Sequence, residues 1–187
     1  TGATGNAFDR ELYVGRRAVE NAVETREPPG HERFYVVSLD KDTVVYKGLL
    51  KAEQVAAYYP ELTDERMRST FVLVHARFST NTLGAWHLAH PYRRIIHNGE
   101  INTIRGNINW MRARENQLAH EDFGDDIETL KPVTEAGQSD TASVDNAIEL
   151  LMHSDRDLPH VLRMLIPEAH ENDDSMDPDR QEWYDYH

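Results

Sequence analysis

The sequence feature that most limits the possible folds of this chain is an almost uninterrupted apolar run, FVLVHARF at positions 71–78. A run of this length between polar residues is typical of a strand that is buried on both faces. Two further runs rich in β-branched and aromatic residues, at 33–39 and 43–50, flank the turn at 40–42 and predict a hairpin. The stretch RRIIH at 93–97 predicts another short strand.

Helical spacing of apolar residues marks other parts of the chain. Asn6 can cap a first helix, and Ser139 or Asp140 can cap a later one, because short polar side chains accept the free N–H groups of a first turn. The apolar residues expected on the inner face of the first helix are Leu12, Val19, Ala22 and Val23. The remaining helical segments are predicted at about 52–59, 103–119 and 158–169.

The mixture of strands and helices lacks the regular βαβ alternation of a doubly wound sheet, so we predict an α+β fold. A length of 187 residues is sufficient for one domain with a sizeable core, and no linker divides residues 1–187. The final acidic stretch, 171–187, has no periodicity and predicts a loop or a frayed end.

The acidic composition narrows the range of partners. The net charge is −13, and the excess of acids is spread along the whole chain, which disfavours nucleic acid and anionic membranes. No apolar run reaches the roughly 18 residues of a membrane span, and no signal peptide is recognisable. We therefore predict a cytoplasmic protein with no membrane partner. The scarcity of lysine suggests a high-salt habitat, since salt screens the repulsion within an acidic surface.

The chain contains no cysteine, which removes disulfides, iron–sulfur ligation and the commonest strong nucleophile from these residues. Neither a phosphate-binding glycine loop nor a serine nucleophile elbow is present. His87 and His90 could bind zinc together with His97 or His75. No carboxylate-bearing partner motif accompanies them, so we predict hydrogen-bonded histidines and no metal.

The pair Asn98–Gly99 allows two interpretations. Asn-Gly between apolar runs is a strong signal for a tight hairpin, because both residues tolerate a positive φ. An Asn side-chain amide beside a Gly backbone N–H is also the donor pair that an oxyanion hole requires. From these residues alone the hairpin is the simpler interpretation.

Polar clusters at the ends of apolar elements favour a site. Arg77, Ser79 and Thr80 follow the long apolar run, and Asp140 begins a predicted helix. Arg77 and Asp140 could simply form a salt bridge, since buried charges are rarely left unpaired. Alternatively, the planar guanidinium of Arg77 binds the carboxylate of an amino acid, and Asp140 accepts from its ammonium group. The side chain of that amino acid would then lie near Asn98 and Gly99.

The sequence at 71–115 resembles the glutaminase region of glutamate synthases, which belongs to the class II glutamine amidotransferases among the N-terminal nucleophile hydrolases. HARFST and HNG match motifs shared across class II amidotransferases, and the longer HNGEINTIRGNINWMRARE points to glutamate synthase. The likeness continues through FDRELYVGRRAVE, QSDTASVDNAIELL and LPHVLRMLIPEA, and so covers most of the chain up to about Ala169.

This resemblance implies a role for each matching residue. Arg77, helped by Ser79 or Thr80, would bind the α-carboxylate of glutamine, and Asp140 would bind its α-amino group. The side-chain amide of Asn98 and the backbone N–H of Gly99 would form the oxyanion hole. The Asn98–Gly99 turn would then serve both as a turn and as part of the site. The alternatives are another class II amidotransferase, such as amidophosphoribosyltransferase, and a catalytically dead module that senses glutamine.

The family's fold is a four-layer α/β/β/α sandwich with two antiparallel sheets, so the resemblance implies part of such a sandwich, incomplete at both ends. The family's nucleophile is a Cys at the first residue of the mature chain. No Cys is present here, and Thr1 is a poor substitute because TGATGN leads through a polar turn into a helix. We therefore expect an internal fragment that is inactive alone.

The resemblance also implies components of the complete enzyme that lie outside this segment. Ammonia from glutamine would convert 2-oxoglutarate to glutamate. FMN, an iron–sulfur cluster and an electron donor, either an NADPH-linked small subunit or ferredoxin, would support that reaction. None of the ligands of these cofactors can be identified here.

Overall fold

The computed structural model describes residues 2–76, 84–97, 99, 101–135 and 137–187. The elements of this part of the chain are α-helices and short 3-10 helices, the latter labelled η. In chain order they are α1 (Gly5–Arg26), η1 (His31–Arg33), α2 (Ala52–Tyr58), η2 (Pro60–Thr63), η3 (Trp86–Leu88), α3 (Ile104–Glu115), η4 (Gly124–Leu130), α4 (Asp140–Met152), α5 (Leu158–Leu165) and α6 (Pro178–Tyr186).

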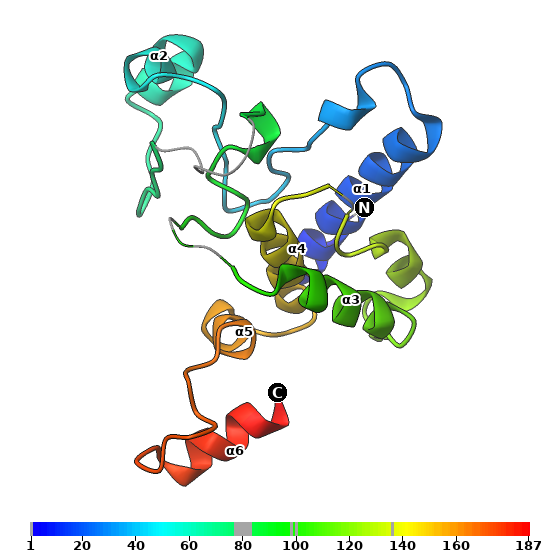
Figure 1. The fold of residues 1–187 in the computed structure, drawn as a ribbon. Coiled ribbons are helices and arrows are strands. Elements are labelled where there is room, and N and C mark those ends of the chain that lie inside the picture. The colour runs from blue at the N-terminus through cyan, green and yellow to red at the C-terminus, as the bar shows by residue number, and fades with distance from the viewer. Residues whose placement is uncertain (1, 77–83, 98, 100, 136) are drawn as a thin grey trace.

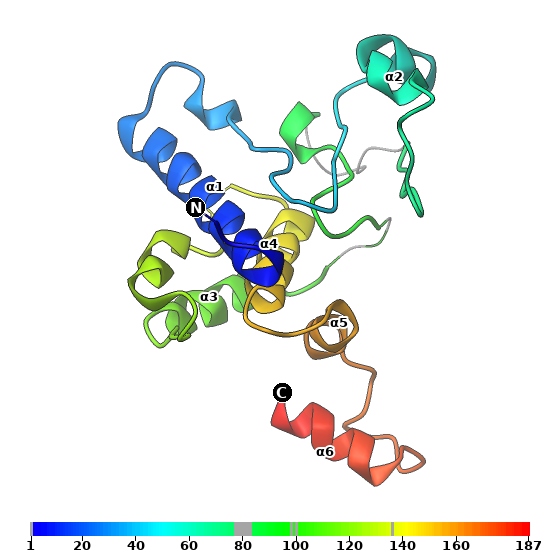
Figure 2. The same cartoon turned by 180° about the vertical axis from the view of Figure 1, so that it is seen from behind.

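Helices α1, α3 and α4 lie together at the centre of the molecule, as Figure 1 shows. Helix α2 lies at one end, and α6 lies at the opposite end beyond α5. The view from behind in Figure 2 shows the same separation, with the C-terminus at the end of α6. Among the described residues, no helix combines the length and the apolar character that crossing a membrane requires.

The hydrophobic core lies where α1 meets η4 and α4. Tyr13 of α1 packs edge-to-face on Phe123, with ring centroids 6.3 Å apart. The buried residues of this cluster are Tyr13, Phe123, Ile127, Leu130, Val133 and Leu150. Contacts between these side chains remove apolar surface from water and so stabilise the central group of helices.

Charged side chains occupy part of the inner face of α1, where apolar ones were predicted. Arg16 is buried, whereas Val19 is 50% exposed. The guanidinium of Arg16 lies 2.7 Å from Glu20 and 2.6 Å from Glu149 of α4. Glu20 also pairs with Arg93 at 2.8 Å. These buried charges are paired, as the cost of removing a charge from water requires, and the pairs connect α1 to α4 and to the chain at position 93.

The predicted α+β sandwich is wrong for the residues that the structure describes, because none of them forms a strand or a sheet. A strand needs a second strand to complete its backbone hydrogen bonds. In this chain, side chains take several of those backbone groups instead. The guanidinium of Arg93 donates to the carbonyl of Val36 at 2.6 Å, and the Tyr59 hydroxyl donates to the carbonyl of Lys47 at 2.7 Å.

The long apolar run is also not the buried strand that its composition predicts. Phe71, Val72 and Val74 are 70%, 74% and 79% exposed, and residues 71–76 have no regular structure. The composition of a run reports its affinity for an apolar environment. Burial also requires other elements to cover it, and the sequence pattern does not supply that information.

Several helix predictions are confirmed. The predicted cap of α4 is Ser139, whose Oγ accepts the N–H of Ala142 at 3.1 Å. Helices α2, α3 and α5 lie inside the segments predicted for them. The stretch 171–187 was predicted to be a loop or a frayed end, but it contains α6, where the Asp177 carboxylate accepts the N–H groups of Asp179 and Arg180 at 3.1 and 3.3 Å.

Candidate functional site

The N-terminus of α4 brings two of the predicted site regions together. Asp140, the first residue of α4, accepts the N–H of Ile101 at its Oδ2 atom, at 3.0 Å. Its Oδ1 atom accepts the N–H of Thr141 at 2.7 Å. Ile101 lies two residues after Gly99 of the HNG turn, so this carboxylate lies beside the turn although 39 residues separate Ile101 from Asp140 in sequence.

Gly99 joins the same cluster through His97. The Gly99 N–H donates to Nδ1 of His97 at 3.1 Å, and Nε2 of His97 lies 2.8 Å from Oγ1 of Thr141. That hydroxyl is also 3.3 Å from Oδ1 of Asp140. The predicted oxyanion donor and the predicted ammonium acceptor therefore belong to one hydrogen-bonded cluster.

The other predicted site residues, Arg77, Ser79, Thr80 and Asn98, lie outside the described residues. Their roles stay predictions. The same holds for the alternative in which Arg77 forms a salt bridge with Asp140.

The histidines of this region lie in a row. The ring of His90 stacks on His75, with centroids 4.6 Å apart, and meets His97 edge-on at 5.5 Å. Burial, reinforced by these two rings, lowers the pKa of His90 to about 4. Because both ring nitrogens of His97 lie within hydrogen-bonding distance of other groups, His97 fits the prediction of a hydrogen-bonded histidine. A depression of about 280 Å³ adjoins this row, lined by residues 48–51, 75–76 and 89–90.

Lys47 lies against the rings of two tyrosines. Its ammonium group is 4.4 Å from the ring of Tyr92 and 4.5 Å from the ring of Tyr35, and it donates to the carbonyl of His87 at 2.9 Å. Burial, with the charge of Arg93 beside it, lowers the pKa of Lys47 to about 7. The cation–π contacts stabilise an ammonium that has little water around it.

Asp145 holds the chain that leads into the HNG turn. Its carboxylate accepts the backbone N–H groups of Arg93, Arg94 and Ile95 at 3.1, 2.8 and 3.2 Å. Burial and the neighbouring Glu149 raise the pKa of Asp145 to about 6, although these N–H donors oppose the rise. The predicted RRIIH strand is therefore wrong, because a helix side chain and not a neighbouring strand satisfies this backbone.

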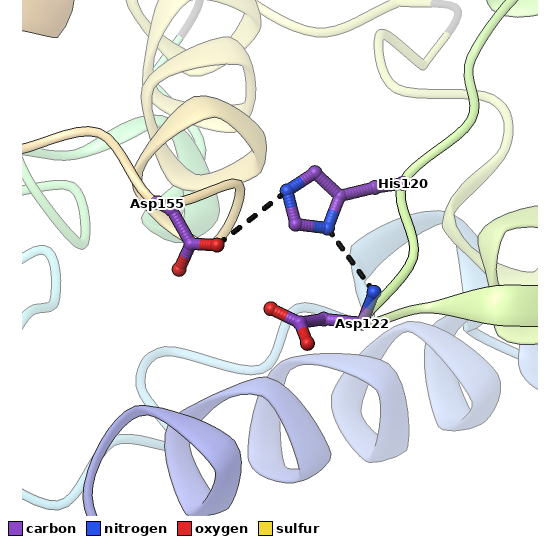
Figure 3. Close-up of side chains that lie close together, drawn as sticks. All are labelled: His120, Asp122 and Asp155. Atoms are coloured by element: carbon purple, nitrogen blue, oxygen red, sulfur yellow. Dashed lines mark hydrogen bonds and ion pairs between the residues drawn. The ribbon is translucent and has the colours of Figure 1, made fainter.

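A separate cluster has the composition of a cation site. The side chains of His120, Asp122 and Asp155 lie close together in Figure 3. Each places one potential ligand atom within 4.8 Å of the others. Arg10 of α1 lies 2.7 Å from the Asp122 carboxylate and 3.0 Å from that of Asp155. Since the guanidinium already supplies positive charge to both carboxylates, we interpret this cluster as a connection of α1 to the turn after α4.

Comparison with known families decides the classification of the chain. The family model described as glutamine amidotransferases class-II matches residues 1–187. The chain belongs to the class II glutamine amidotransferases.

Curated proteins that are similar to this class II amidotransferase chain are named glutamate synthases. The large chain of glutamate synthase (NADPH) from Bacillus subtilis (strain 168) is 48% identical over 97% of the chain. Glutamate synthase (NADH) from Saccharomyces cerevisiae (strain ATCC 204508 / S288c) is 49% identical over 96%, and ferredoxin-dependent glutamate synthase from Antithamnion sp. is 38% identical over 96%. The chain spans 12%, 8% and 12% of the length of these three relatives.

The region of the candidate site contains buried charged groups that the sequence did not reveal. Lys47 lies within a predicted strand, and Asp145 within a predicted helix, where a charged residue normally faces water. Asp145 is completely buried. Asp145 lies one turn before Glu149 on α4. Like charges at this spacing destabilise a helix, so the pair was the available signal that partners from outside α4 offset the two charges.

Proposed function

We propose that this chain carries the glutamine-binding and oxyanion-hole part of the glutaminase domain of a glutamate synthase. The observation that supports this most is the 3.0 Å hydrogen bond from the Ile101 N–H to the Asp140 carboxylate. It sets the acidic start of α4 beside the HNG turn, as a site for both ends of an amino acid requires. The names of the relatives favour this function over that of another class II amidotransferase, such as amidophosphoribosyltransferase.

In the proposed site, Arg77 binds the α-carboxylate of glutamine through its two parallel N–H groups, with Ser79 or Thr80 as a further donor. Asp140 accepts hydrogen bonds from the α-ammonium group. These two contacts fix the substrate at its charged end, so that the side-chain amide lies at the HNG turn.

The reaction needs stabilisation of an oxyanion. A nucleophile adds to the side-chain amide carbon, and the carbonyl oxygen becomes negatively charged in the tetrahedral intermediate. The Asn98 side-chain amide and the Gly99 N–H donate to this oxygen. The C–N bond then breaks, and the nitrogen leaves as ammonia with the proton that the nucleophile gave up when it attacked. Water then breaks the bond between the nucleophile and the acyl carbon, which releases glutamate and returns a proton to the nucleophile. The net reaction is glutamine plus water giving glutamate plus ammonia. The family resemblance assigns the nucleophile to a Cys, a residue type that these 187 positions do not contain.

In the whole protein, the ammonia would convert 2-oxoglutarate to glutamate with electrons from an NADPH-linked small subunit or ferredoxin, using FMN and an iron–sulfur cluster. The residues of this chain do not fit the cluster, because the chain offers no thiolate. We therefore assign no step of that reaction to these residues.

Glutamine hydrolysis by the full-length protein, followed as ammonia release, tests the proposal. Arg77→Lys should raise KM for glutamine roughly tenfold or more, because lysine keeps the charge and loses the two-pronged geometry. Asn98→Ala should lower kcat by about 10² to 10³-fold, the usual effect of removing one oxyanion donor. Asp140→Asn should weaken the binding of glutamine far more than that of glutaramate, which lacks the α-amino group.

Asp125→Asn serves as the control, because this acid is exposed and lies in η4. Unchanged kcat in Asn98→Ala together with unchanged KM in Arg77→Lys and Asp140→Asn would refute the proposed site. Glutamine binding without any hydrolysis by the full-length protein would instead support a glutamine-sensing module.

A further inference from the structure

We propose that His97 and Thr141 are positioning residues that hold Gly99 and Asp140 at a fixed separation, and that they do so without contacting the substrate. The proposal rests on the function proposed above for Gly99 and Asp140. It adds two residues to the site and assigns each a different effect on the reaction.

The hydrogen bonds of the cluster have one consistent direction. The Gly99 N–H donates to Nδ1 of His97, so the ring proton must lie on Nε2. Nε2–H then donates to the Thr141 hydroxyl at 2.8 Å, and that hydroxyl is free to donate to Oδ1 of Asp140 at 3.3 Å. His97 and Thr141 each accept a hydrogen bond from one neighbour and donate one to the other. The hydrogen bonds therefore run without interruption from Gly99 to the Asp140 carboxylate.

The burial of these residues separates positioning groups from ligand-binding groups. Thr141 is 4% exposed, and its hydroxyl is already engaged on both sides. Gly99, in contrast, is exposed at the tip of the turn. A ligand that approaches the turn therefore meets Gly99 and Asp140, whereas Thr141 acts on the ligand only through them.

The contact between His97 and Gly99 resembles an Asx turn, in which a side-chain acceptor binds the N–H two residues later. It keeps the Gly99 N–H at the edge of the turn. Loss of Nδ1 would remove the contact that fixes this N–H, so the donor to the oxyanion should be less well positioned and the catalytic step should slow. Loss of the Thr141 hydroxyl should instead alter the orientation of Asp140, and with it the binding of glutamine.

The test uses steady-state kinetics of the full-length protein with glutamine. Thr141→Val removes the hydroxyl and keeps the shape, and it should raise KM roughly three- to tenfold, the effect of losing the hydrogen bond that orients Asp140. Thr141→Ser retains the hydroxyl and should restore KM to within about twofold of the original value. A role confined to packing would give the opposite order, because valine fills the site better than serine.

Substitutions of His97 separate its two nitrogens. His97→Asn places an amide oxygen where Nδ1 accepts from Gly99 but does not reach Thr141, so KM should rise as in Thr141→Val while kcat stays. His97→Gln reaches Thr141 and leaves the Gly99 N–H without its acceptor, so kcat should fall roughly three- to tenfold. The double variant His97→Asn/Thr141→Val should show the KM of Thr141→Val, since that variant has already lost the contact between His97 and Thr141.

The outcomes distinguish this proposal from the proposed function. If Asp140→Asn and Asn98→Ala have their expected effects while Thr141→Val and His97→Asn keep the original KM, only the positioning role is refuted. If Thr141→Val and His97→Asn raise KM independently, so that their effects multiply, the connection through His97 is likewise refuted. If Asp140→Asn and Asn98→Ala have no effect, the glutamine site itself is wrong.

Discussion

Replacing His153 with phenylalanine should change how the stability of the fold depends on pH. His153 lies directly after α4, and its ring stacks on Tyr13 of α1 with centroids 4.7 Å apart and planes 17° apart. Burial lowers the pKa of His153 to about 4, although the nearby Glu149 carboxylate opposes this. The core therefore holds this ring in its neutral form.

The magnitude follows from the difference between the folded and the unfolded pKa. An unfolded histidine titrates near 6.5, so between pH 6.5 and 4 the unfolded chain binds more protons at this position than the folded chain does. The stability that the neutral ring provides is complete above pH 6.5 and is lost as the pH falls toward 4. A difference of about 2.5 pKa units corresponds to about 3 kcal/mol in the free energy of unfolding.

Urea unfolding at several pH values between 7 and 4 measures this effect. His153→Phe keeps the stacking on Tyr13 and cannot titrate, so its stability relative to the original protein should rise by about 3 kcal/mol across the interval. Met152→Leu, at the preceding residue, is the matched control and should change stability equally at every pH. Parallel pH profiles for His153→Phe and the original protein, or an NMR titration of the His153 ring near pH 6.5, would contradict this reasoning.

Two further substitutions test the buried charges. Glu149→Ala should lower the free energy of unfolding by about 3–5 kcal/mol, because Arg16, 2.6 Å from the Glu149 carboxylate, loses one of its two partners in the interior. Urea unfolding measures this loss, and a loss below about 1 kcal/mol would contradict the prediction. Asp145→Ala should lower the free energy of unfolding by at least about 3 kcal/mol, because three backbone N–H groups lose their acceptor. Hydrogen exchange at residues 93–95 should also accelerate relative to exchange in α5. Unchanged exchange would show that Asp145 does not hold this backbone.

The features that the sequence predicted correctly depend on neighbours within one helical turn. Ser139 caps α4 through a hydrogen bond to Ala142, three residues later, so the signal and its effect lie in the same short stretch. Pro60 follows α2 and ends it for a similarly local reason, since proline cannot continue the hydrogen-bond pattern. The region around Asp140 was predictable because its composition is that of a helix start.

The features that were predicted wrongly depend on distant partners. The runs at 33–39 and 43–50 have the composition of strands, but strands form only when another backbone lies alongside. The arginines on the inner face of α1 were not predicted, because an amphipathic pattern assigns burial to apolar residues. Arg16 is buried because Glu149, on another helix, neutralises it at 2.6 Å. No local pattern contains that information.

The anchoring of the HNG turn explains why a turn is required there at all. Helix α4 holds the chain before the turn, through Asp145 and the N–H of Ile95, and holds it again after the turn, through Asp140 and the N–H of Ile101. The two carboxylates come from residues five positions apart on a helix, which corresponds to about 7–8 Å along its axis. Six residues of extended chain could span about 20 Å. The length of chain between the anchors therefore exceeds the distance between them. Gly99 lies between the two anchors in sequence and is exposed. A turn held at Ile95 and Ile101 is therefore compatible with the oxyanion-donor role proposed for Gly99, whose N–H lies within the hydrogen-bonded cluster that also contains Asp140.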